Sequence, residues 1–175
     1  VAGMAPRLPW LKIGIEQVRL MVETAFTTLQ ELPSDQMANT LMDLLTSLGE
    51  SSPTLENRAE AFILENGSPL CRYRMREHQS GRAARSGSLD DAVTHWRQAL
   101  VAAEESGIPV LIASATMSLG ISLQWHQDGR EALPVLERSL AQWKSLGIVD
   151  YSHGGNYSAM VTLAGAQARS GQPDE

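Results

Sequence analysis

The densest group of side chains that could do chemistry lies between residues 72 and 85. Five of the chain's twelve arginines fall within these fourteen residues, and Glu77 is the only acid among them. The five are Arg72, Arg74, Arg76, Arg82 and Arg85. Guanidinium groups bind carboxylates and phosphates through paired hydrogen bonds, so this segment is a candidate site for an anionic ligand.

A helical register gathers part of this group on one face. At 100° per residue, one arc of about 80° holds four side chains, Arg74, His78, Arg82 and Arg85. Two interpretations stay open. The face is either a patch that receives an acidic peptide, a carboxylate or a phosphate, or a set of ion pairs with nearby acids. We favour ion pairing, because charged runs are usually solvated faces; the acids are Glu56, Glu60, Asp90 and Asp91.

Other reactive residue types do not form a pattern. The four histidines, His78, His95, His126 and His153, lack the spacing of a zinc motif. A nucleophile, a base and an orienting group do not occur together, and Cys71 is the single cysteine. We therefore expect a protein that is not an enzyme and that needs no metal and no cofactor.

The elements that must position these side chains repeat along the sequence. Four landmarks return after forty residues: Ala92, Trp96, Ala99 and Gly107 become Ala132, Leu136, Ser139 and Gly147. A fixed period of this size indicates an array of repeats. Small residues recur where two helices must approach closely, since a bulky side chain would separate them.

Start and stop signals predict eight helices with short turns. Ser34, Ser52-Pro53 and Ser68-Pro69 are helix-start signals, and glycines such as Gly107 and Gly147 suit helix ends. The expected ranges are 10–31, 35–48, 53–65, 69–86, 89–106, 109–127, 130–146 and 151–170. The fold class is therefore all-α, built from antiparallel helix pairs.

Composition restricts the class of protein. The chain has 175 residues, a net charge of −6 and a pI near 5.2, which argue against a nucleic-acid binder. Charged residues interrupt the longest apolar stretch, residues 10–29, so we expect no membrane span. A single cysteine and no visible signal peptide predict a cytoplasmic protein. The sequence begins without methionine and ends inside a third copy of the repeat, so we expect a fragment of a longer protein.

The small and bulky positions resemble the tetratricopeptide repeat. That repeat has a small residue at its eighth position, alanine at its twentieth, a bulky residue at its twenty-fourth and a small one at its twenty-seventh. The matching residues are Gly120, Ala132, Leu136 and Ser139, preceded by Ser80, Ala92, Trp96 and Ala99. The longer period is similar to a long-helix variant in large ATP-binding bacterial regulators of the LuxR type and in related signalling ATPases.

This resemblance implies a fold and a kind of function. Residues 68–175 would form an α-solenoid whose last repeat is truncated, and residues 1–67 a divergent cap or degenerate repeat. The parent would be a multidomain protein of signalling or transcription regulation. Its concave face would bind a peptide, possibly acidic, a partner protein or a small inducer, with no direct contact to nucleic acid or membrane.

The repeat positions that line the concave face in this family supply the candidate binding residues. Together with the arginine face they are Arg74, His78, Arg82, Arg85, Met117, Ile121, Gln124, Trp125 and Arg169. Two alternatives stay open for Trp125: it holds a ligand, or the next helix half-covers it. The alternative function is self-association, as a homodimer through the first helix or the truncated last helix.

Overall fold

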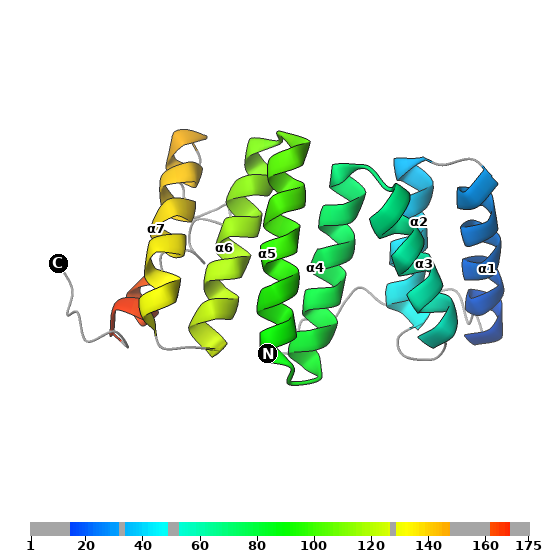
Figure 1. Cartoon of the computed structure of the whole chain (residues 1–175), viewed down its shortest axis with the longest axis horizontal. Coiled ribbons are helices and arrows are strands. Elements are labelled where there is room, and N and C mark those ends of the chain that lie inside the picture. Colours follow the sequence, from blue (N-terminus) through cyan, green and yellow to red (C-terminus); the bar gives the residue numbers. More distant parts are fainter. Residues whose placement is uncertain (1–14, 32–33, 49–52, 127–128, 148–161, 169–175) are drawn as a thin grey trace, which may run out of the picture. The chain divides into compact units, whose positions relative to one another are not determined.

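The computed structural model describes residues 15–31, 34–48, 53–126, 129–147 and 162–168, and every regular element in these residues is a helix. The chain divides into two compact units, residues 1–62 and 63–175. The labelled helices are α1 (Ile15–Glu31), α2 (Asp35–Leu48), α3 (Pro53–Asn66), α4 (Pro69–Arg85), α5 (Leu89–Ser106), α6 (Pro109–His126) and α7 (Gly129–Ser145) (Figure 1). Residues 162–168 are also helical. The expected all-α class with eight helices is confirmed.

Local sequence signals account for the helix ends. The Ser34 hydroxyl accepts a hydrogen bond from the Met37 amide at 3.1 Å, and Ser68 accepts one from the Cys71 amide at 3.3 Å. Each bond satisfies an amide that the first turn of a helix leaves without a partner. Gly107 ends α5 with φ of 66°, a left-handed conformation that glycine adopts without steric cost.

The first unit has a core of its own. Val22, Phe26 and Leu29 of α1 are buried, as are Leu41 and Leu45 of α2. The ring of Phe26 meets the ring of Phe62 edge-on at a centroid distance of 5.7 Å, and the Arg58 guanidinium lies 5.4 Å from the Phe26 centroid. Burial of these aromatic and aliphatic side chains is what holds this unit together.

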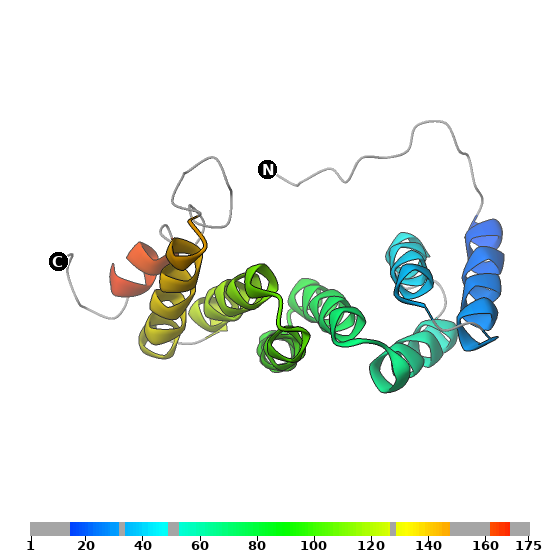
Figure 2. The ribbon, with the colours of Figure 1, turned by 90° about the horizontal axis from the view of Figure 1, so that it is seen from above.

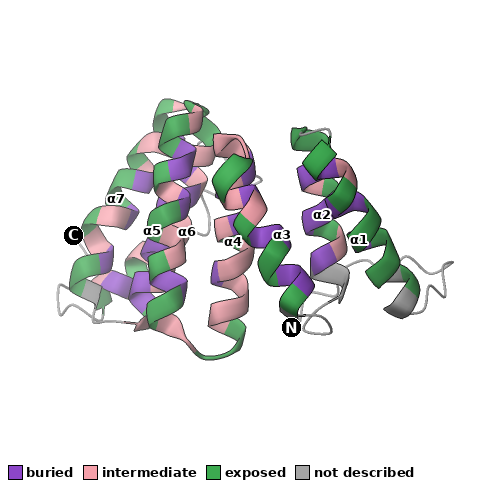
Figure 3. Cartoon of the chain, turned by 45° about the vertical axis from the view of Figure 1, so that its right-hand side comes forward, coloured by how far each residue is buried: buried purple, intermediate pink, exposed green. Residues whose placement is uncertain are grey.

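In the second unit, each helix from α4 to α7 packs against the next one in the sequence. Helices α4 and α6 also meet, since Tyr73 and Ala115 belong to one buried cluster. Viewed from above, α5 is displaced to one side of α4 and α6 (Figure 2). Burial follows this arrangement, with buried residues on the faces that meet and exposed residues on the outer faces (Figure 3).

Close helix contacts occur where the repeat pattern places small residues. A Cβ atom on Gly120 of α6 would lie 2.6 Å from Leu136 Cδ2 of α7, which is too close for two carbon atoms. The hydroxyl of Ser139 donates to the Ala113 carbonyl at 3.1 Å, and that of Ser80 donates to the Ala92 carbonyl at 3.0 Å. Both serines are buried, so these bonds link neighbouring helices across a dry contact.

Two ion pairs connect α5 with α7. Arg97 Nη2 lies 2.6 Å from Glu131 Oε1, and Arg138 Nη2 lies 2.8 Å from Glu104 Oε1. In each pair the two residues are 34 positions apart in the sequence. The equal separation is what two parallel helices give when their offset stays constant along their length. All four side chains are about half exposed, so each pair contributes little stability by itself.

Cys71 is fully buried in the first turns of α4. Among the described residues, no helix combines the length and the apolar character that crossing a membrane requires.

Candidate functional site

The candidate site is the surface that α4 and α6 share. Ten residues line a hollow of about 160 Å³ there, which we call the Trp125 hollow. They are Ser80, Gly81 and Ala84 of α4, Leu89, Ala92 and Trp96 of α5, and Ser118, Ile121, Ser122 and Trp125 of α6. The hydroxyls of Ser118 and Ser122 lie among apolar groups, so the lining can hold an apolar group and still offer hydrogen bonds.

Trp125 is the most exposed aromatic side chain among the described residues at this site. Its side chain sits beside the hollow with 64% of the residue exposed, whereas Trp143 is only 7% exposed and Trp96 is half-buried. An exposed indole offers a large apolar area and one N–H donor. Of the two open alternatives for Trp125, the structure therefore leaves the ring accessible rather than covered.

Arg85 lies close to one of the residues that line this hollow. Its Nη1 atom is 3.4 Å from the place where a Cβ on Gly81 would be, and Gly81 lines the hollow. The absence of a side chain at Gly81 lets the guanidinium lie close to the helix. An accessible cation next to an apolar hollow suits a ligand that carries both an apolar and an acidic group.

Nearer the start of α4, the predicted arginine face has an acidic neighbour, because Glu77 lies close to Arg74. Burial raises the pKa of Glu77 above its ordinary value, and the neighbouring Arg74 guanidinium opposes that rise. The pKa of Tyr73 is raised by burial first and by Glu77 second, while a hydrogen bond with the Ser114 side chain lowers it. Arg74 and Glu77 are thus neighbouring opposite charges. Tyr73 beside them connects α4 to α6 through its hydrogen bond with Ser114.

Two of the four acids considered as ion-pair partners, Asp90 and Asp91, bond to residues other than arginine. Asp90 pairs with His126 at the end of α6, and Asp91 accepts a hydrogen bond from the Ser88 hydroxyl at 2.6 Å. The hydrogen bond to Asp90 raises the pKa of His126 above its ordinary value. His126 follows Trp125 directly, and Leu89 precedes Asp90, so this pair lies beside the hollow.

The remaining predicted site residues have different positions. Ile121 lines the hollow, and Met117, His78 and Arg82 are half-buried. Gln124 is 4% exposed, and its amide nitrogen donates to the Thr162 carbonyl at 3.0 Å. Its side chain therefore connects α6 to residues 162–168 and does not reach the surface. Arg169 lies outside the described residues.

Sequence reasoning missed most of the residues that line the hollow. Ser80, Ala84, Leu89, Ser118 and Ser122 are small or unremarkable residues, and none was a candidate. A signal did exist, because the repeat pattern places Ser80 and Ala92 at a close helix contact, and small side chains there leave space above them.

The sequence matches no known protein-family model and no curated protein with which it was compared.

Proposed function

We propose that this chain is a non-catalytic binding module built from tetratricopeptide-like helix pairs. Its α4–α6 surface binds a peptide segment of a partner protein, or a small inducer, with the apolar part of the ligand in the Trp125 hollow. The parent would be a cytoplasmic protein of signalling or transcription regulation. The observation that carries the proposal is the exposed Trp125 ring beside an apolar hollow with Arg85 close to its lining.

Three physical features support this proposal. The hollow is already formed, so little reorganisation opposes binding. Tryptophan and arginine are the residues that most often dominate the binding energy of an interface. A hollow of about 160 Å³ accommodates a single apolar side chain, which is a scale typical of peptide recognition.

The test is selection from a random peptide library followed by substitution. Peptides selected on the native chain should lose at least tenfold in affinity on Trp125→Ala and several-fold on Arg85→Gln, because these changes remove the apolar wall and the nearby cation. The matched control is Val110→Ala, which shortens an exposed apolar side chain at the other end of α6. Circular dichroism checks that each variant folds. Selected peptides that bind Trp125→Ala as well as the native chain would refute the proposal.

Self-association is the second candidate, and α1 supplies the observation that favours it. Leu20 and Met21 are 63% and 45% exposed, although both are large and apolar. Contiguous exposed apolar surface can mark an interface, and these two residues are neighbours in the sequence. A homodimer through α1 should dissociate in Leu20→Ser/Met21→Ser, as measured by sedimentation equilibrium. A native chain that stays monomeric at about 100 μM, where interfaces of even modest affinity are occupied, rules out this function.

The other end of the chain gives self-association less support. Leu163 packs against the buried cluster that includes Leu119 and Leu136, so it is already partly covered within one molecule. Val161, an apolar residue two positions earlier in the sequence, lies outside the described residues.

A further inference from the structure

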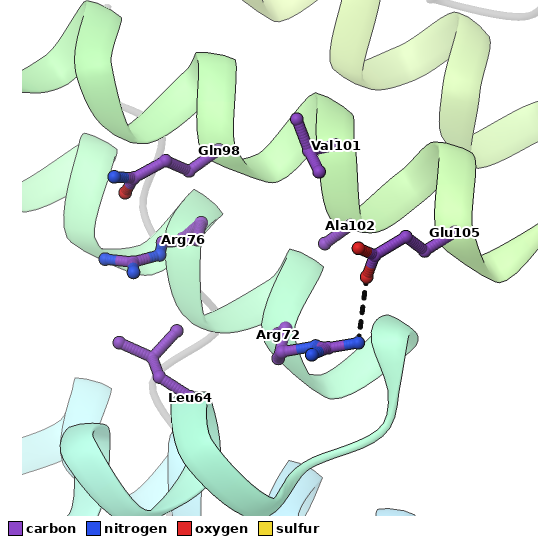
Figure 4. Close-up of a pocket in the computed structure, with 7 residues that line it drawn as sticks. All are labelled: Leu64, Arg72, Arg76, Gln98, Val101, Ala102 and Glu105. Atoms are coloured by element: carbon purple, nitrogen blue, oxygen red, sulfur yellow. Dashed lines mark hydrogen bonds and ion pairs between the residues drawn. The ribbon is translucent and has the colours of Figure 1, made fainter.

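A second hollow, of about 230 Å³, lies between α4 and α5 and shares no lining residue with the Trp125 hollow. We call it the Arg72 hollow. Seven described residues line it: Leu64, Arg72, Arg76, Gln98, Val101, Ala102 and Glu105. Figure 4 shows these side chains around one opening, with α4 below and α5 above. Nothing in the proposed function uses this surface.

Helical spacing explains how the lining comes together. Arg72 and Arg76 are four residues apart in α4, so they lie on one face of that helix. The α5 residues Gln98, Val101, Ala102 and Glu105 form a single stripe at intervals of three, one and three residues. Leu64, in the last turn of α3, adds an apolar wall.

The lining combines positive charge with an apolar floor. Among the seven lining residues, two are arginines and Glu105 is the single acid, so the charge of the hollow is positive by one. Arg72 Nη2 already pairs with Glu105 Oε2 at 2.8 Å, whereas the buried Arg72 Nε atom has no hydrogen-bond partner. Val101 is 54% exposed, which leaves an apolar surface next to these cations.

The equivalent place one repeat later carries an ion pair. Forty residues after Leu64 and Gln98 stand Glu104 and Arg138, and these two bond to each other at 2.8 Å between α5 and α7. Forty residues after Arg72 and Arg76 stand Ile112 and Thr116, which carry no charge. Leucine and glutamine cannot form the ion pair that is present at the later position. The first repeat thus has an opening and two cations where the second has a bonded surface.

We propose that the Arg72 hollow binds an acidic peptide segment of a partner protein. One apolar side chain of that segment lies on Val101 and Leu64, and a carboxylate next to it pairs with the Arg76 guanidinium, whose Nη1 also donates to Gln79 Oε1. The hollow is smaller than the 300 Å³ or more, roughly, of ordinary small-molecule pockets, so a side chain of a peptide fits it better than a separate metabolite. The excess positive charge selects an acid over a neutral or basic segment.

The experiment uses the full chain and two synthetic probes. One is the blocked pentapeptide acetyl-Leu-Glu-Leu-Glu-Leu-amide, and the other has glutamine in place of glutamate. Binding is followed by NMR, through the Val101 methyl groups and the arginine Nε–H signals. We expect the acidic peptide to shift these signals and to bind at least tenfold more tightly than the glutamine peptide. The difference should shrink between about 50 and 500 mM salt, because added ions screen exposed charges.

Three variants locate the site. Arg76→Gln should weaken binding of the acidic peptide about tenfold. Leu64→Glu/Gln98→Arg copies the ion pair of the later repeat and should abolish binding while the helical content stays unchanged. Arg97→Gln is the matched control, since it removes the same charge from α5 at a position that does not line the hollow.

The outcomes separate this inference from the proposed function. Binding that survives Trp125→Ala but not the Leu64/Gln98 double substitution supports the Arg72 hollow. Binding lost in Trp125→Ala and kept in the double substitution places the peptide in the Trp125 hollow and overturns the inference. Equal affinity for the two peptides, or no binding by either at millimolar concentration, also overturns it.

Discussion

The α4–α5 and α6–α7 pairs follow one forty-residue pattern but present different surfaces. Both are held by small buried residues, Ser80 and Ala92 in the first and Gly120 and Ala132 in the second. The first helix of the first pair carries five arginines, whereas α6 is apolar on nearly all sides. Helix α6 packs against α4, α5 and α7. These contacts explain its apolar character, because a helix with neighbours on several sides needs no wide polar face. The repeated residues determine packing, and the residues that are not repeated determine surface chemistry.

The largest expected effect comes from breaking the close contact in the second pair. Gly120→Val should lower the free energy of unfolding by about 3 kcal/mol, because the added atoms overlap Leu136 in a packed interior. Urea denaturation followed by circular dichroism measures it. Gly81→Ala is the control in the first pair. Its methyl group would meet only Arg85 Nη1 at 3.4 Å, so stability should rise by about 0.5–1 kcal/mol. Equal effects of the two changes would contradict the comparison.

A smaller effect should follow from removing the buried serine hydroxyls. Ser139→Ala in the second pair and Ser80→Ala in the first should each lower the free energy of unfolding by about 1 kcal/mol, the usual contribution of one such hydrogen bond. Denaturant midpoints of the two variants measure this. The surface residue Ser145, replaced by alanine, is the control, because its hydroxyl bonds only within its own helix. A loss in one pair alone would mean that the two contacts are not energetically alike.

The Glu104–Arg138 ion pair and the equivalent position one repeat earlier, Leu64 and Gln98, can be compared by double-mutant cycles. Glu104→Gln and Arg138→Gln should show a coupling energy of about 0.5 kcal/mol, which falls in high salt because both groups are half exposed. Leu64→Glu and Gln98→Arg should create a similar coupling in the first pair. No coupling at the new pair would mean that the distance between the helices, rather than residue type, keeps this position open.

The smallest effect concerns the exposed His126–Asp90 pair next to the Trp125 hollow. The folded pKa of His126 is raised above 6.5, so its stabilisation is complete below that unfolded value and is lost as pH rises through the folded pKa. The melting temperature of the native chain, relative to His126→Gln, should therefore be higher near pH 5.5 than above about pH 8.5. Thermal melts across this range test it. A constant difference would show that the pair has no role in the pH dependence.

Much of the fold follows from the sequence because its signals are local. The α2 and α5 boundaries match the expected 35–48 and 89–106, since a cap or a glycine marks each end. Other ends differ by one residue, as with α7, which begins at Gly129 instead of Arg130. The expected beginning of the first helix, 10–14, and most of the last, 151–170, lie outside the described residues.

The site was harder to predict because it depends on contacts between helices. Trp125 and Ile121 were candidates, since repeat position alone puts them on the shared face. Gln124 has the same helical neighbourhood, yet its amide is buried against the Thr162 carbonyl, a contact 38 residues away. Asp90 was expected to meet an arginine and meets His126 instead. Helix periodicity gives the face of a residue, but the choice of partner depends on distances that the sequence does not contain.

The buried Cys71 gives this molecule an internal reporter. Its side chain has no exposed surface, so a thiol reagent can modify it only when α4 transiently separates from its neighbours. The alkylation rate therefore measures how often that separation happens. Because the 175 residues contain no second thiol, the mass increase of the intact chain on alkylation measures this opening directly. No dye and no added cysteine are needed.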